Sequence, residues 1–250
     1  MITLRQVITC YLLFIHLFIG LVLLKKDIIT RIKAKIGMET ERAELTPQYY
    51  GLLAFHKRID KNIADNSVIF IGDSLTQGLA VSAIYPQSVN FGIGYDTTKG
   101  VLNRIPQYNA ISRAKAVVIA IGFNDLNWRS NAEIIQNYLK IIDAIPDNTK
   151  IIFNTILPVN EKRRNRIGLN ARINEINNKL QKICQNNPKV HFLNMTNLLI
   201  NTDKNLANKY HIGDGVHLSR LGNAVWIKKI KEALYSLEKR RMVTFTELLG

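Results

Sequence analysis

The sequence predicts an α/β fold in which a mainly parallel sheet of five strands is covered by helices on both faces, with a transmembrane helix in front of it. Short β-branched apolar runs alternate with longer segments of helical periodicity. Parallel strands need such helical crossovers between them. With 250 residues, 47% of them hydrophobic, the chain can bury the core of one ordinary domain.

The first element is Val7–Leu24, an apolar run of eighteen residues without a formal charge. As a helix it would span about 27 Å, close to the hydrocarbon thickness of a bilayer. It ends in Lys25-Lys26 without a small-residue cleavage site. We therefore expect residues 1–26 to form an uncleaved, single-pass membrane anchor.

Two further segments flank the expected domain. Residues 27–62 are charged and helix-prone, are interrupted at Thr46-Pro47, and carry aromatic residues at Tyr49, Tyr50 and Phe55. We interpret them as a juxtamembrane connector that packs onto the domain at 63–239. Residues 240–250 are interpreted as a C-terminal tail.

Within the domain, five apolar runs predict strands and two amphipathic segments predict covering helices. The predicted strands are Val68–Ile71, Val89–Phe91, Ala116–Ile121, Lys150–Asn154 and Val190–Leu193. The predicted helices are Asn131–Ala144 and Asn170–Cys184. In such open sheets, reactive residues are expected at the carboxyl ends of the strands.

Composition excludes several classes of protein. There are 34 Lys and Arg against 19 Asp and Glu, a net charge of +15, but the basic residues are scattered and no nucleic-acid-binding motif accompanies them. No nucleic-acid partner is expected. The two cysteines, Cys10 and Cys184, do not suggest a disulfide framework. His56, His191 and His211 have no partners at metal-ligand spacing, so no metal is expected.

The candidate nucleophile is Ser74. The strand at Val68–Ile71 leads directly into Gly72-Asp73-Ser74-Leu75, and a helical stretch follows. At the amino terminus of a helix, free N–H groups and the helix dipole favour developing negative charge. For an isolated Gly-Asp-Ser sequence, a simple helix cap at Asp73 or Ser74 would be the better interpretation.

Three other residues favour the catalytic interpretation. Asn124 follows the predicted strand at Ala116–Ile121 and can donate an amide hydrogen to an oxyanion. Asp214 lies three residues before His217, a spacing that lets a carboxylate approach an imidazole within one turn. His217 can then accept the proton of Ser74 while Asp214 holds the ring tautomer.

Four sequence blocks, in order, resemble those of the SGNH, or GDSL, hydrolase family: VIFIGDSLTQG, NFGIGYDTTKGVLNRI, AIGFND and DGVHLSRLGNAVW. The resemblance covers about Asn66 to Glu238, and its second block is similar to the platelet-activating-factor acetylhydrolase branch. It implies a flavodoxin-like three-layer α/β/α sandwich. It also implies Ser74 as nucleophile, Asn124 as oxyanion donor, and Asp214 and His217 as the rest of the triad.

One position departs from the family pattern. The second block usually has glycine before its Asp-Thr pair, where the backbone N–H serves the oxyanion hole, and this chain has Tyr95. Tyrosine still supplies an N–H, but it cannot adopt every conformation open to glycine. Its ring could also narrow the acyl pocket.

The resulting expectation is a serine esterase that hydrolyses esters or thioesters through an acyl-serine intermediate, without a cofactor. Its substrate would be an ester-bearing lipid or an acetylated glycan. Two alternatives stay open: acyl transfer to an envelope glycan or lipid, and an inactive membrane-tethered binding module. The membrane face of the domain stays open. The positive residues after residue 24 favour the cytoplasm, whereas anchored hydrolases more commonly face outward. The oligomeric state stays open as well.

Overall fold

The computed structural model describes residues 3–23 and 44–249. The chain divides into two units, Met1–Ala43 and Glu44–Gly250. In the first unit, helix α1 spans Leu4–Leu23. The predicted transmembrane helix is not supported, because within the two described stretches no helix combines the length and apolarity that a membrane crossing requires. Leu24, Lys25, Lys26 and the first part of the predicted connector, 27–43, lie outside the described residues.

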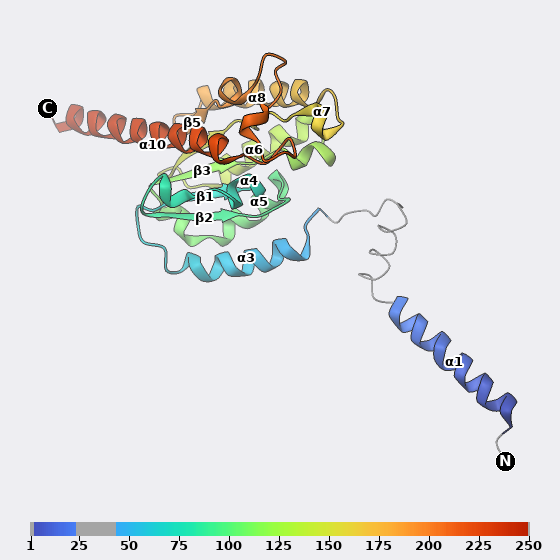
Figure 1. Cartoon of the computed structure of the whole chain (residues 1–250). Coiled ribbons are helices and arrows are strands. Elements are labelled where there is room, and N and C mark those ends of the chain that lie inside the picture. Colours follow the sequence, from blue (N-terminus) through green and yellow to red (C-terminus); the bar gives the residue numbers. More distant parts are fainter. Residues whose placement is uncertain (1–2, 24–43, 250) are drawn as a thin grey trace. The chain divides into compact units, whose positions relative to one another are not determined.

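The second unit is built on a five-stranded sheet with the order β2-β1-β3-β4-β5 (Figure 1). Every neighbouring pair in it is parallel. All five strands occur where the sequence predicts them, and only the ends of three differ, by one residue. The strands are β1 (Val68–Gly72), β2 (Ser88–Gly92), β3 (Ala116–Ala120), β4 (Lys150–Asn154) and β5 (Val190–Leu193).

Helices connect and cover these strands. Helix α6 has the predicted bounds, because Ser130 and Glu133 form a reciprocal capping box at its start. Helix α8 is one residue longer at each end than predicted, and α10 continues through residues 240–249 of the predicted tail. The helices are α3 (Pro47–Asp60), α4 (Ser74–Gln77), α5 (Thr98–Arg104), α6 (Asn131–Ala144), α7 (Glu161–Arg164), α8 (Leu169–Gln185), α9 (Thr196–Leu199) and α10 (Arg220–Leu249).

The sheet separates two apolar cores, which gives three layers. Side chains alternate across a strand, so Ile69 and Ile71 face the core that includes residues of α3, α5, α6 and α8. Val68 and Phe70 face the other core, which contains Trp226 of α10. This is the predicted α/β/α sandwich.

Helix α3 is part of this unit. Thr46 caps it by accepting a hydrogen bond from the N–H of Tyr49 at 3.2 Å, and Pro47 occupies its first turn. Tyr49 and Leu53 are buried in the core. The second half of the predicted connector thus covers the sheet.

The register of the sheet determines where the functional residues meet. Gly72, the last residue of β1, lies opposite Gly92 of β2 and Ala120 of β3. The three strands therefore end at one edge, and the loops that follow them, containing Ser74, Tyr95 and Asn124, leave the sheet together.

Candidate active site

Ser74 forms one hydrogen-bonded chain with two side chains that lie far from it in the sequence, His217 and Asp214. The Ser74 hydroxyl donates to Nε2 of His217 at 2.9 Å. Nδ1 of His217 donates to Oδ2 of Asp214 at 2.5 Å. All three side chains are half-buried, so solvent and a small substrate can reach them. A serine, a histidine and a carboxylate in this arrangement can generate a nucleophile.

The residues around Ser74 explain its position. Asp73 is the N-cap of α4, and its carboxylate accepts a hydrogen bond from the N–H of Leu75 at 3.0 Å. Ser74 is thus the first residue of α4, where N–H groups have no partner within the helix. The helix-cap interpretation and the nucleophile interpretation therefore do not exclude each other. Asp73 caps the helix, and Ser74 faces His217.

The loop that carries Asp214 and His217 is fixed by its own backbone. Oδ1 of Asp214 accepts the N–H groups of Val216 at 2.9 Å and His217 at 3.0 Å. Gly215 has a positive φ of 80°, and a Cβ there would lie 2.9 Å from Cβ of Arg163, so no larger residue fits without a shift. The three-residue spacing therefore brings carboxylate and imidazole together as predicted.

The charge of Asp214 suits this role. Partial burial raises its pKa, but the hydrogen bonds from His217 and from the two backbone N–H groups outweigh that effect. The pKa of Asp214 consequently lies below its ordinary value. The carboxylate stays ionised and can stabilise a protonated His217.

Asn124 lies at the start of the short 3₁₀ helix Asn124–Asn127, directly after β3 and its loop. Its side-chain amide donates to the carbonyl of Asp96 at 3.0 Å. An Asn amide has two donors, so one N–H remains for an oxyanion. Next to it, buried Asp125 accepts the N–H of Thr98 at 2.8 Å, which joins the loops after β2 and β3.

Tyr95 occupies the left-handed region of the backbone, with φ 64°. Glycine adopts this conformation without a steric penalty, whereas a residue with a Cβ pays about 1–2 kcal/mol. The side chain of Tyr95 is 58% exposed. The loop after β2 thus keeps the conformation of a glycine-containing turn although a tyrosine occupies it.

Three residues of the site escape sequence reasoning. Asp96 supplies the carbonyl that orients Asn124, Asp125 links two loops, and Arg104 forms a fully buried ion pair with Asp96 at 2.9 Å. Asp96 and Asp125 lie inside the second and third sequence blocks, and each follows the end of a strand. A polar residue in such a position was the signal that could have identified them. Arg104 also lies inside the second block, but nothing in the sequence indicates that it is buried, because an arginine in an amphipathic helix is usually exposed.

Burial raises the pKa of three acids around the site, Asp73, Asp96 and Asp125. It raises the pKa of Asp73 to about 7, although the hydrogen bond from Leu75 opposes the rise. The folded protein therefore binds a proton that the unfolded chain has released at lower pH. Stability contributed at this position falls as pH rises from about 4 to about 7.

We predict that Asp73→Asn becomes progressively more stable than the wild type across this pH window. Asparagine keeps a side-chain oxygen that caps α4 but cannot ionise. The difference in unfolding free energy should grow by at most about 1.4 kcal/mol per pH unit. Urea unfolding at pH 4.5, 6 and 7.5 measures it, with exposed Asp143→Asn on α6 as the charge-matched control. A difference that stays constant across the window contradicts the prediction.

Among residues 3–23 and 44–249, no cluster of three His, Cys, Asp or Glu side chains could hold a metal ion.

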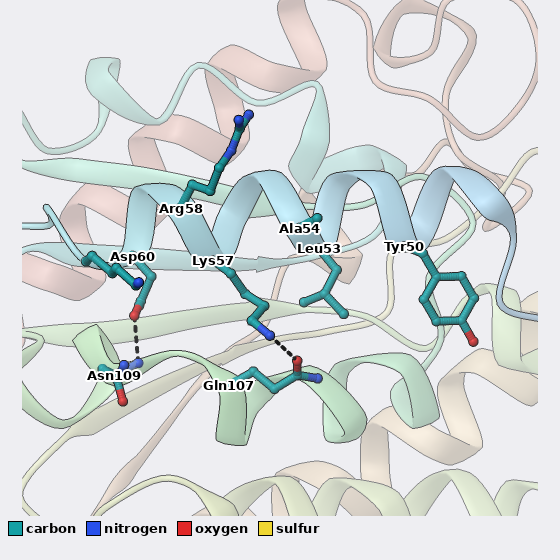
Figure 2. Close-up of a pocket in the computed structure, with 9 residues that line it drawn as sticks. Tyr50, Leu53, Ala54, Lys57, Arg58, Asp60, Gln107 and Asn109 are labelled. Atoms are coloured by element: carbon teal, nitrogen blue, oxygen red, sulfur yellow. Dashed lines mark hydrogen bonds between the residues drawn. The ribbon is translucent and has the colours of Figure 1, made fainter.

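A groove lies along α3, where Nζ of Lys57 donates to Gln107 at 3.2 Å and Asp60 accepts the N–H of Asn109 at 2.8 Å (Figure 2). None of the residues of the Ser74 relay lines this groove, so the groove is separate from the candidate active site.

The chain is similar to known proteins over most of its length. Residues 70–225 match the model of the GDSL-like lipase/acylhydrolase family. The alpha1 subunit of platelet-activating factor acetylhydrolase IB from Bos taurus is 28% identical over 183 residues, which cover 68% of this chain and 76% of that protein. A Drosophila melanogaster homolog of the beta subunit is 29% identical over 199 residues, 74% of this chain and 83% of its own.

The fold also has relatives among solved structures. A Streptococcus pneumonia protein named for platelet activating factor superposes with a TM-score of 0.70 at 24% identity, covering 76% of this chain and 94% of its own. At this identity the likeness concerns the fold alone. It matches the three-layer arrangement built above.

Proposed function

This chain belongs to the GDSL-like lipase/acylhydrolase family, and on that premise we propose that it is an esterase that removes acetyl and other short acyl groups through an acyl intermediate on Ser74. The family and its acetylhydrolase relatives establish a serine hydrolase that acts on esters. The observation that carries the proposed mechanism is the hydrogen-bonded relay of Ser74, His217 and Asp214.

The proposed reaction has two halves. His217 takes the proton of Ser74 as Oγ attacks the ester carbonyl, and it then delivers that proton to the departing alcohol oxygen. This leaves the acyl group bonded to Oγ. In the second half His217 takes a proton from water, the resulting hydroxyl attacks the acyl carbon, and the proton returns to Oγ as the free acid leaves.

Negative charge builds up on the carbonyl oxygen in both halves. We assign its stabilisation to the N–H of Ser74 at the start of α4, the side-chain amide of Asn124 and the backbone N–H of Tyr95. Asp214 stabilises the imidazolium that exists at the same moment, which its lowered pKa allows. No cofactor takes part in these steps.

Two observations support a small acyl group. The curated relatives are named as acetylhydrolases. In addition, Tyr95 carries a ring at the position where the family pattern has glycine, next in sequence to Asp96, whose carbonyl accepts the amide of Asn124. An acetylated glycan or a lipid acetyl ester both fit this description, and they share the acetyl ester that the site would cleave.

The substrate proposal is tested with p-nitrophenyl acetate, butyrate and octanoate. We predict that kcat/KM of the wild type falls with chain length, and that Tyr95→Gly raises the octanoate-to-acetate ratio by at least about tenfold, since pocket volume decides discrimination between acyl chains. Tyr95→Phe keeps the ring and serves as the matched control. A wild type that prefers octanoate, or a ratio unchanged in Tyr95→Gly, would contradict a pocket closed by Tyr95.

A further inference from the structure

Arg104 is the last residue of α5 and is completely buried. Its side chain and that of Asp96 are both 0% exposed, and Nε donates to Oδ2 of Asp96 at 2.9 Å. Its other nitrogens donate to the carbonyl of Phe91 at 2.7 Å, the carbonyl of Gly72 at 3.2 Å and the hydroxyl of Tyr108 at 3.2 Å. One guanidinium group thus holds four acceptors from different parts of the chain.

These acceptors lie at the catalytic edge of the sheet. Gly72 ends β1 two residues before Ser74, and Phe91 is the penultimate residue of β2. Asp96 follows Tyr95 directly in the loop after β2. Arg104 therefore ties together the strand end that presents the nucleophile and the loop proposed to supply an oxyanion donor.

The link to Asn124 runs through Asp96. The carboxylate of Asp96 is held by Arg104 and by the N–H of Thr97 at 2.9 Å, and its carbonyl accepts the amide of Asn124 at 3.0 Å. A Cβ at Gly100 would lie 1.9 Å from Oδ1 of Asp96, so α5 packs against this carboxylate as closely as glycine permits. With the carboxylate fixed, the direction of the carbonyl and of the Asn124 amide is fixed too.

We propose that Arg104 is a positioning residue, which orients the oxyanion donor Asn124 through Asp96. The inference rests on the proposed role of Asn124 in hydrolysis. The hydrogen bonds of Arg104 go to Asp96, Phe91, Gly72 and Tyr108 and not to the relay of Ser74, His217 and Asp214, so its effect on the reaction passes through the loop that it anchors.

Charge alone does not perform this function. Burial lowers the pKa of Arg104, but Asp96 and Tyr108 more than offset that effect, so the group stays protonated. A lysine could keep the ion pair with Asp96. It has no planar fork, however, and cannot reach the carbonyls of Gly72 and Phe91 in the same geometry.

The test is a double-mutant cycle on kcat for p-nitrophenyl acetate, using Arg104→Lys and Asn124→Ala in the full chain. Small displacements of a catalytic group can cost up to about 100-fold in rate. We expect Arg104→Lys to lower kcat by about 10- to 100-fold with little change in KM. In the Asn124→Ala background the same substitution should lower kcat by less than about threefold, because the donor it orients is already absent.

A second variant keeps the proposal testable if Arg104→Lys fails to fold. Tyr108→Phe removes one acceptor of Arg104 without changing any charge. It should lower kcat by a few-fold in the wild type and leave kcat unchanged in the Asn124→Ala background. Arg113→Lys is the matched control, because Arg113 also donates to backbone carbonyls, those of Asp60 at the end of α3 and Ile63 after it, outside the site. It should leave kcat unchanged.

The outcomes separate this inference from the proposed function. If Asn124→Ala alone keeps full kcat, the assignment of Asn124 as oxyanion donor is wrong, and the role of Arg104 is overturned with it. If Asn124→Ala is impaired but Arg104→Lys and Tyr108→Phe lower kcat equally in both backgrounds, only the positioning role is overturned. Non-additive losses in both cycles support it.

Discussion

Ser74→Ala is expected to lower kcat for p-nitrophenyl acetate by at least about 10⁴-fold while leaving the fold intact. Without Oγ no acyl-enzyme can form, and losses of this size accompany removal of the nucleophile from such relays. The hydrogen bond of Oγ to His217 is the contact that the substitution removes, so the thermal midpoint should change little. Steady-state kinetics and thermal unfolding of the same preparation measure both quantities.

The matched control for this change is Ser236→Ala on α10, where the hydroxyl only donates to the carbonyl of Ala233 at 2.8 Å. It should keep wild-type kcat. A Ser74→Ala protein with more than about one tenth of the wild-type kcat would exclude Ser74 as the nucleophile.

His217→Ala is expected to lower kcat to a similar extent, and combining it with Ser74→Ala should add almost nothing. The two groups act as one unit, because the hydroxyl at 2.9 Å is activated only by the imidazole that accepts its proton. Losses from such units are strongly non-additive. The measurement is kcat of the two single variants and the double variant under one set of conditions.

The control for this change is His191→Gln in β5, away from the relay, which should keep full activity. If the losses in Ser74→Ala and His217→Ala multiply in the double variant, the two residues act independently and the relay is not the catalytic unit.

The sheet could be predicted from the sequence because its strands are short apolar runs between helical segments. The last residues of β1 and β2 could not be predicted. Gly72 and Gly92 belong to the strands because their backbones pair with each other, and neither carries an apolar side chain that would indicate a strand. Hydrophobicity marks what is buried, whereas hydrogen bonds decide where a strand stops. The predicted N-terminal membrane span is not supported, because no helix among residues 3–23 and 44–249 combines the length and apolarity that a crossing requires.

The candidate side chains of the site could be named from the sequence, whereas the residues that support them could not. Ser74, Asn124, Asp214 and His217 occur at strand ends and on a late loop, and the fold brings Ser74, Asp214 and His217 into contact. The buried ion pair of Arg104 and Asp96 leaves no trace in periodicity, because charged residues are almost always exposed unless paired. Pairing depends on the fold, which a single sequence shows only indirectly.

Covalent labelling tests directly whether Ser74 is the nucleophile. The full chain is incubated with a fluorophosphonate and digested, and the modified peptide is identified by mass spectrometry, with Ser74→Ala and His217→Ala treated in parallel. We expect one adduct on the peptide containing Ser74, none in Ser74→Ala, and much slower labelling in His217→Ala. An active protein that remains unlabelled at Ser74, or that is labelled at another serine in the Ser74→Ala variant at the wild-type rate, would contradict it.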